Sequence, residues 1–132
     1  MMVEDNPDDR MIYGNVLCYN GYNVLLVTDG GSAVRIRKAY EPDLILLDIG
    51  LFDVNGLDIC TELSQSAEGP AIPIVALSAY SGSEMAERAR ALGCVQYIQK
   101  PASPVQLLHI VEQIVGRAPP TGEDPGPRVL TS

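Results

Sequence analysis

The chain is 132 residues long, 46% of them hydrophobic and 20% charged, and it carries a formal net charge of −8. This length and apolar content predict one domain with a buried core, without room for a second module. The nine Lys and Arg residues are dispersed, so direct binding to nucleic acid or to an anionic membrane is not expected, whereas protein partners are.

Short apolar runs alternate with amphipathic stretches along the chain. This alternation indicates successive strand–helix units, and five such units predict an α/β fold with a doubly wound, five-stranded parallel sheet. Right-handed crossovers between parallel strands place helices on both faces of such a sheet. The predicted strands lie near residues 1–4, 22–27, 43–48, 72–78 and 95–98.

The N-terminal end combines a short strand with a clear helix start. Only three residues precede the first acidic pair, so the first strand is expected to be short unless the chain has lost residues there. Asn6 can cap the helix that follows, and Pro7 suits its first position. Asp8 and Asp9 then complement the positive end of the helix dipole.

Helical periodicity predicts which faces of the helices are buried. In the first helix, Ile12, Val16 and Tyr19 recur at helical spacing and are expected to face the core. The single histidine, His109, points away from the apolar face of the last helix and is expected to be a solvated surface residue. That apolar face consists of Leu107, Leu108, Ile110, Val111, Ile114 and Val115.

The composition changes after residue 116. Proline, glycine and charged residues dominate the segment 117–132 and supply little apolar surface to offset the entropy of ordering it. We therefore expect a folded domain over 1–116 and a disordered tail over 117–132.

Cysteine usage and hydropathy indicate the compartment. Cys18, Cys60 and Cys94 are odd in number, widely spaced and free of any C-x-x-C pair, so neither a disulfide framework nor a zinc site is expected. The sequence contains no run of 18 apolar residues and no basic, apolar leader. These features predict a cytoplasmic protein.

Polar side chains stand at or just beyond the ends of four predicted strands. They are the pair Glu4-Asp5, then Asp48, Ser78 and Lys100. Because the carboxyl ends of parallel strands meet at one edge of a sheet, these side chains are expected to share a pocket. Carboxylates that lie close together repel one another and call for a hard cation with oxygen ligands. This composition suits phosphoryl transfer to an aspartate.

With these motifs and their spacing, the chain resembles the receiver domains of two-component response regulators over about residues 1–116. The resemblance implies the flavodoxin-like strand order 2-1-3-4-5. It also implies that Asp48 is the phosphoacceptor and that Ser78 and Lys100 contact the phosphoryl group. A Mg²⁺ cofactor would be bound directly by Asp5 and Asp48, by the backbone carbonyl of Gly50, and by Glu4 through water.

Three aromatic residues carry further expectations. Tyr97 resembles the receiver switch residue that moves together with Ser78, although an ordinary strand aromatic is the alternative. Tyr80, two residues beyond Ser78, could restrict the access of water to the phosphoryl group. Phe52 stands where receivers often have proline in the loop after the phosphoacceptor.

The implied function is a phosphoaspartate switch. It accepts a phosphoryl group from the phosphohistidine of a sensor histidine kinase or phosphotransfer protein in a Mg²⁺-dependent reaction. A conformational change then signals to a downstream protein target, without independent substrate turnover. Direct contact with nucleic acid or membrane is not expected.

Other functions of the same fold fit the residues less well. A flavin or nucleotide binder would not place an acidic cluster after the first strand, where the cofactor phosphate binds. A hydrolase of the haloacid dehalogenase family would have a second aspartate at the position of Gly50. The remaining alternative is a receiver-like interaction module that does not cycle phosphate.

Overall fold

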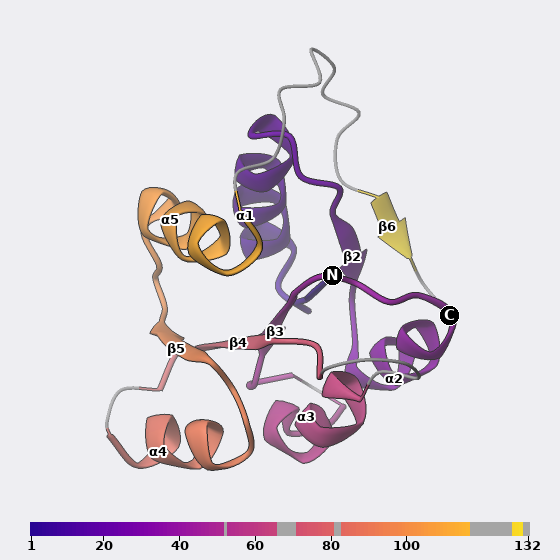
Figure 1. Ribbon diagram of the computed structural model, residues 1–132, viewed down its shortest axis with the longest axis vertical. Coiled ribbons are helices and arrows are strands. Elements are labelled where there is room, and N and C mark those ends of the chain that lie inside the picture. The colour runs from indigo at the N-terminus through magenta and orange to yellow at the C-terminus, as the bar shows by residue number, and fades with distance from the viewer. Residues whose placement is uncertain (52, 66–70, 81–82, 117–127, 131–132) are drawn as a thin grey trace.

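A computed structural model describes residues 1–51, 53–65, 71–80, 83–116 and 128–130 (Figure 1). Strands and helices alternate along the chain, as the sequence pattern predicted. The elements are β1 (Met2–Val3), α1 (Pro7–Tyr19), β2 (Leu25–Val27), α2 (Gly30–Ala39), β3 (Ile45–Asp48), α3 (Gly56–Ser64), β4 (Ile74–Ser78), α4 (Ser83–Ala91), β5 (Gln96–Gln99), α5 (Pro104–Val115) and β6 (Arg128–Leu130).

The strands form one parallel sheet in the order β5-β4-β3-β1-β2-β6. The first five strands therefore follow the predicted order 2-1-3-4-5, which is confirmed. β1 is only two residues long, and Met2 lies between Leu26 of β2 and Leu46 of β3. This central place brings the residues after β1 to the same sheet edge as the end of β3.

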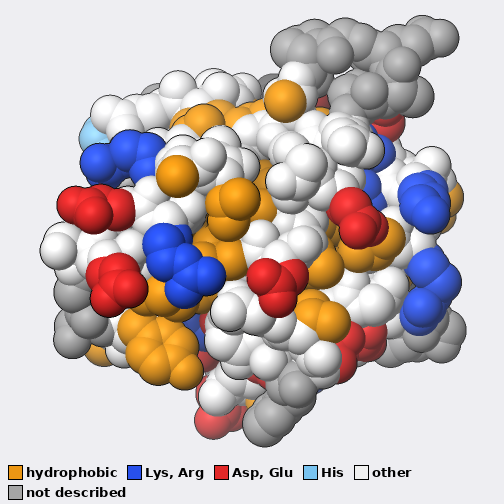
Figure 2. Space-filling view, turned by 90° about the horizontal axis from the view of Figure 1, so that it is seen from below, with side chains coloured by type: hydrophobic (Ala, Val, Ile, Leu, Met, Phe, Trp, Pro, Cys, Tyr) orange, Lys and Arg blue, Asp and Glu red, His pale blue; other side chains and the backbone are white. Residues whose placement is uncertain are grey.

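Helices cover both faces of the sheet. α1 and α5 lie on one face and α2, α3 and α4 on the other (Figure 1). Successive strand residues alternate between the two cores: Ile45 and Leu47 face the α2–α3–α4 side, and Leu46 faces the α1–α5 side. Figure 2 views the side of α3 and α4, where acidic and basic side chains are interspersed with apolar ones.

The predicted buried face of α1 is wrong. Tyr13 and Leu17 are buried, whereas Ile12 is 50% exposed and Tyr19 is 79% exposed. Both sets of residues satisfy the helical period, so periodicity alone could not choose between them. The Asn6 cap sets where the helix begins, and its side chain accepts hydrogen bonds from the backbone N–H groups of the predicted first turn, as expected.

The last helix agrees with its predicted pattern. Leu107, Ile110 and Val111 are buried against the sheet, and His109 is exposed. Here a broad apolar face leaves only one way to dock the helix. Pro104 begins α5, and Ser103 caps it by accepting a hydrogen bond from the backbone N–H of Gln106.

A sixth strand lies where a disordered tail was expected. Arg128–Leu130 pairs in parallel with Leu25–Val27 of β2 at the outer edge of the sheet (Figure 1). The Pro- and Gly-rich composition of 117–132 led to the prediction of disorder and gave no sign of the short strand at Arg128–Leu130. The edge of β2 offers backbone N–H and C=O groups that such a run can satisfy. Residues 117–127 and 131–132 lie outside the described part of the chain, as does Phe52, and the domain boundary at 116 stays a prediction.

The cysteines and the helix lengths can be compared with the expectations about disulfides and membrane spans. Cys18, Cys60 and Cys94 are all buried and none is in a disulfide. The sulfur atoms of Cys60 and Cys94 lie 3.5 Å apart, close enough to share a thiol hydrogen bond. Within the described ranges, no helix has both the length and the apolar character needed to cross a bilayer.

Candidate functional site

The strand ends converge as predicted. Glu4 and Asp5 follow β1, Asp48 ends β3, and Ser78 ends β4. One carboxylate oxygen from each of Glu4, Asp5 and Asp48 lies within 4.8 Å of the other two. Glu4 is fully buried and Asp48 is 6% exposed, so two of these three carboxylates are largely removed from solvent. Such a cluster is compatible with a bound divalent cation because hard cations prefer oxygen ligands.

Lys100 supplies the positive charge of the site. Its Nζ donates to Glu4 Oε2 at 2.7 Å, to Asp9 Oδ2 at 3.0 Å and to Asp48 Oδ2 at 3.4 Å. The three donors of an ammonium group thus meet three carboxylates. Asp9 was predicted only as a partner of the helix dipole, because its contact with Lys100 depends on a rotational phase of α1 that the sequence left open.

Burial and the contact between Glu4 and Lys100 act in opposite directions on the pKa of each group. Burial raises the pKa of Glu4 to about 7, against the lowering effect of its hydrogen bond from Lys100. Burial opposes the charge on Lys100, but its hydrogen bonds to Glu4 and Asp9 outweigh this and raise the Lys100 pKa above the ordinary value. Lys100 is therefore charged at neutral pH, while Glu4 can exchange a proton there.

The loop after β3 is shaped around the Asp48 carboxylate. The backbone N–H of Gly50 donates to Asp48 Oδ1 at 2.9 Å, and a Cβ at Gly50 would lie 3.5 Å from that oxygen. Gly56, at the start of α3, packs so closely that a Cβ there would lie 2.6 Å from the Cα of Ile49. Only glycine permits this approach without a shift of the backbone that follows Asp48.

The same loop is fixed to a neighbouring helix by Asp53. Its carboxylate accepts hydrogen bonds from the backbone N–H groups of Gly30 and Gly31, at 3.0 and 2.9 Å. These bonds lower the pKa of Asp53, with the Gly30 bond as the largest cause. Asp53 therefore caps α2 from a distant part of the sequence, which sequence reasoning did not anticipate.

Ser78 connects to both tyrosines singled out from the sequence. Its buried Oγ accepts a hydrogen bond from the backbone N–H of Tyr80 at 3.0 Å. The carbonyl of Tyr80 accepts from the hydroxyl of Tyr97 at 3.0 Å. Two hydrogen bonds, both to the backbone of Tyr80, thus connect Ser78 at the end of β4 with the side chain of Tyr97 in β5.

Two side chains that sequence reasoning missed hold the backbone around the site. Arg10 Nη1 donates to the backbone carbonyls of Glu4 and Asp5, both at 3.2 Å. The Tyr13 hydroxyl accepts from the backbone N–H of Ala102 at 3.0 Å, just beyond the cis Lys100-Pro101 peptide bond. Both side chains come from α1, so the docking of this helix fixes the position of the site.

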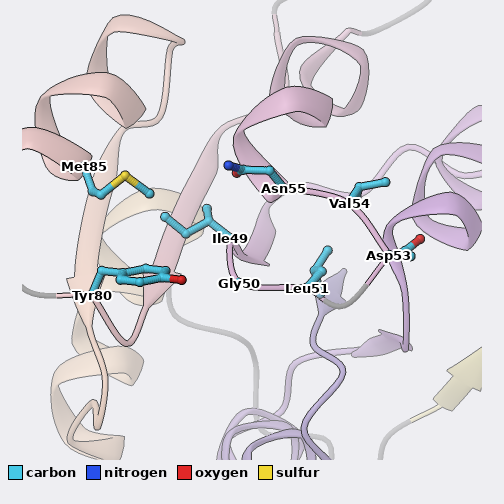
Figure 3. Close-up of a pocket in the computed structure, with 8 residues that line it drawn as sticks. All are labelled: Ile49, Gly50, Leu51, Asp53, Val54, Asn55, Tyr80 and Met85. Carbon is cyan, nitrogen blue, oxygen red and sulfur yellow. The ribbon is translucent and has the colours of Figure 1, made fainter.

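An open pocket of about 540 Å³ is bordered by the loop that directly follows Asp48 (Figure 3). Tyr80 and Met85 stand on one side of it and Asp53 and Val54 on the other, with Gly50 between them. The Tyr80 ring extends toward the loop that carries Gly50 and is 60% exposed. Ile49, Leu51 and Asn55 complete the lining.

A parallel sheet of this order, with an acidic cluster and a lysine at its carboxyl edge, defines the receiver class of proteins. The sequence profile of the response regulator receiver domain matches residues 1–112. The chain belongs to the response regulator receiver domain family. Receiver domains are signalling modules that bind Mg²⁺ at an acidic pocket and interact with histidine kinases and downstream effectors.

Several known proteins are similar to this chain. The polar-differentiation response regulator DivK of Brucella ovis is 32% identical over 118 residues, covering 89% of this chain and 96% of DivK. The receiver domain of sensor histidine kinase PA1611 from Pseudomonas aeruginosa, solved with a magnesium ion coordinated in its active site cleft, is 32% identical with a TM-score of 0.77, covering 87% of this chain and 94% of that one. The receiver domain of NtrX from Brucella abortus is 26% identical with a TM-score of 0.78, covering 86% of this chain and 95% of that one.

Proposed function

We propose that Asp48 is the phosphoacceptor of a signalling switch and takes its phosphoryl group from a phosphohistidine on a sensor histidine kinase or phosphotransfer protein. The convergence of Glu4, Asp5 and Asp48 within 4.8 Å, with Lys100 hydrogen-bonded to Asp48, supports this proposal most directly. In the transfer, an Asp48 carboxylate oxygen forms a bond to phosphorus while the phosphorus–nitrogen bond to imidazole breaks. The donor histidine leaves as a neutral imidazole once it has taken up a proton.

The donor set fits a Mg²⁺ ion. Asp5 and Asp48 would bind it directly, Glu4 through a water molecule, and Gly50 through its backbone carbonyl, which keeps the few-carboxylate ligation that Mg²⁺ prefers. A bound divalent ion would supply positive charge that offsets repulsion between the carboxylates and the incoming phosphoryl oxygens.

Lys100 and Ser78 would stabilise the phosphoryl group after transfer. The Lys100 ammonium already donates to Asp48 Oδ2 and can neutralise charge on phosphoryl oxygens attached there. The Ser78 Oγ accepts from the Tyr80 N–H, so its hydroxyl proton can be donated to a phosphoryl oxygen.

The hydrogen bonds that join Ser78, Tyr80 and Tyr97 offer a path for the output signal. Movement of Ser78 toward a phosphoryl group would pull on the backbone of Tyr80 and change the carbonyl that Tyr97 binds. β5 and the adjoining α4 and α5 would then present an altered surface to a downstream protein. In this role the chain turns over no substrate of its own.

A mass measurement after treatment with acetyl phosphate and Mg²⁺ tests the proposal. The wild-type chain should gain about 80 Da, the mass of one phosphoryl group, and Asp48→Asn should not. Asp58→Asn, which changes an exposed carboxylate in the first turn of α3, serves as the matched control and should still gain the mass. An Asp48→Asn chain that becomes phosphorylated would refute the assignment. A wild type that never does would favour the interaction module.

A further inference from the structure

Asp9 reaches the proposed phosphorylation site through Lys100. It lies in the first turn of α1, on the same helical stripe as Tyr13, which contacts the backbone just after Lys100. Its carboxylate accepts from Lys100 Nζ at 3.0 Å, and its side chain is 28% exposed against 12% for Lys100. The preceding residue, Asp8, is exposed to solvent.

The distances show which carboxylates hold the ammonium most closely. Glu4 and Asp9 lie nearer to Lys100 Nζ than Asp48 does, at 2.7 and 3.0 Å against 3.4 Å. An ammonium has three donors, so any hydrogen bond given to a phosphoryl oxygen on Asp48 must be taken from or shared with a present acceptor. The contact with Asp48 Oδ2 is the longest of the three, so bringing Nζ closer to a phosphoryl oxygen there draws it away from Glu4 or Asp9. Glu4 is buried and belongs to the carboxylate cluster, which leaves Asp9 as the acceptor that can turn to water at low cost.

We propose that Asp9 is a positioning residue that competes with the phosphoryl group on Asp48 for Lys100. The inference rests on the proposed phosphoacceptor function. Asp9 holds part of the ammonium's hydrogen-bonding capacity, and its negative charge opposes the build-up of phosphoryl charge nearby. Removing that charge should let Lys100 turn fully toward the phosphoryl group and speed its acquisition.

Asp9→Asn and Asp8→Asn form a matched pair for the first test. Both substitutions remove one negative charge from the same turn of α1, but only Asp9 accepts a hydrogen bond from Lys100. The rate of phosphorylation would be followed at saturating Mg²⁺ over a range of acetyl phosphate concentrations. We expect a rate constant about three- to ten-fold higher in Asp9→Asn, and a change below about two-fold in Asp8→Asn. Asp9→Glu, which keeps the charge, should remain close to wild type.

A second measurement does not depend on phosphorylation. The unfolding free energies of Asp9→Asn, Lys100→Met and the double variant form a cycle that reports the coupling between the two side chains. The coupling should be clearly larger than in the equivalent cycle with Asp8→Asn. Equal couplings would overturn the pairing on which the inference depends.

The results separate the inference from the proposed function. A wild type that gains phosphate, with an Asp9→Asn rate equal to or below that of wild type, overturns the competition while leaving Asp48 as phosphoacceptor. An equal acceleration in Asp8→Asn also overturns it, since a general charge effect would then explain the rate. A wild type that never gains phosphate refutes the proposed function itself, and the role of Asp9 in transfer falls with it.

Discussion

Tyr80 and Gly50 line the same pocket. The loop that directly follows Asp48 carries Gly50, and the Tyr80 ring extends toward this loop (Figure 3). Hydrolysis of an aspartyl phosphate requires a water molecule in line with the phosphorus. A ring in this position can hinder that approach, whereas Gly50 has no side chain to do so.

We therefore expect Tyr80→Ala to shorten the lifetime of the phosphorylated state by about two- to ten-fold. Phosphate release would be followed after removal of the donor. Tyr40→Ala, another partly exposed tyrosine placed at the end of α2, is the control. The backbone bonds of Tyr80 to Ser78 and Tyr97 remain possible in the variant. A release rate no faster than in wild type would contradict the steric role.

The sequence predicted the strand-end residues of the site better than the helix residues. Asp48 and Ser78 each end a strand, and parallel strands bring such ends together whatever the details of packing. Asp9 and Tyr13 act from α1, and their place depends on the rotation of that helix about its axis. Composition and spacing do not determine such a rotation.

At the scale of elements, α1 carries two apolar stripes that contribute differently to the stability of the fold. Tyr13 and Leu17 fill the core shared with α5 and the sheet, while Ile12 and Tyr19 remain largely outside it. Burial, more than hydrophobicity, decides what a residue contributes to stability.

Leu17→Ala should consequently lower the free energy of unfolding by about 2–5 kcal/mol through lost burial and a cavity. Tyr19→Ala should change it by less than about 1 kcal/mol, because its side chain is mostly in solvent already. Urea denaturation of both variants provides the comparison. Similar losses would contradict this docking, and a larger loss in Tyr19→Ala would mean that α1 docks through the face first predicted from the sequence.

The α5 pattern succeeded where the α1 pattern failed, for a physical reason. Six apolar residues spread over α5 define one broad face, and His109 lies outside it. The shorter stripes of α1 allow two choices. The sixth strand escaped prediction for a related reason, since a three-residue run in a Pro- and Gly-rich segment has no periodicity to detect.

For the whole molecule, the buried Glu4 links stability to pH. Its pKa of about 7 in the folded state lies above the ordinary value of 4.5, so the folded state binds a proton more tightly than the unfolded chain does. The stabilisation from this group is complete below about pH 4.5 and is lost as the pH rises through 7.

In the absence of Mg²⁺, the free energy of unfolding of the wild type should therefore fall by up to about 3 kcal/mol between pH 5 and 8, relative to that of Glu4→Gln. Urea unfolding of both proteins across this range isolates the contribution of Glu4 from that of other carboxylates. Saturating Mg²⁺ should raise the melting temperature of the wild type and flatten the difference, because a cation favours the ionised cluster. Parallel pH profiles without Mg²⁺ would exclude proton exchange at Glu4.

Asp53 restrains the loop that carries Gly50, so this loop needs little rearrangement to bind an ion. By capping α2 through Gly30 and Gly31, it ties down the far side of the loop that carries Gly50, while Gly56 packs its end against Ile49. A loop that is already restrained at both points loses less conformational entropy than an unrestrained loop when its backbone binds an ion. Under the proposed function, the helix cap on α2 would preorganise the loop that follows Asp48, and affinity for the ion would be gained in a part of the chain that never touches it.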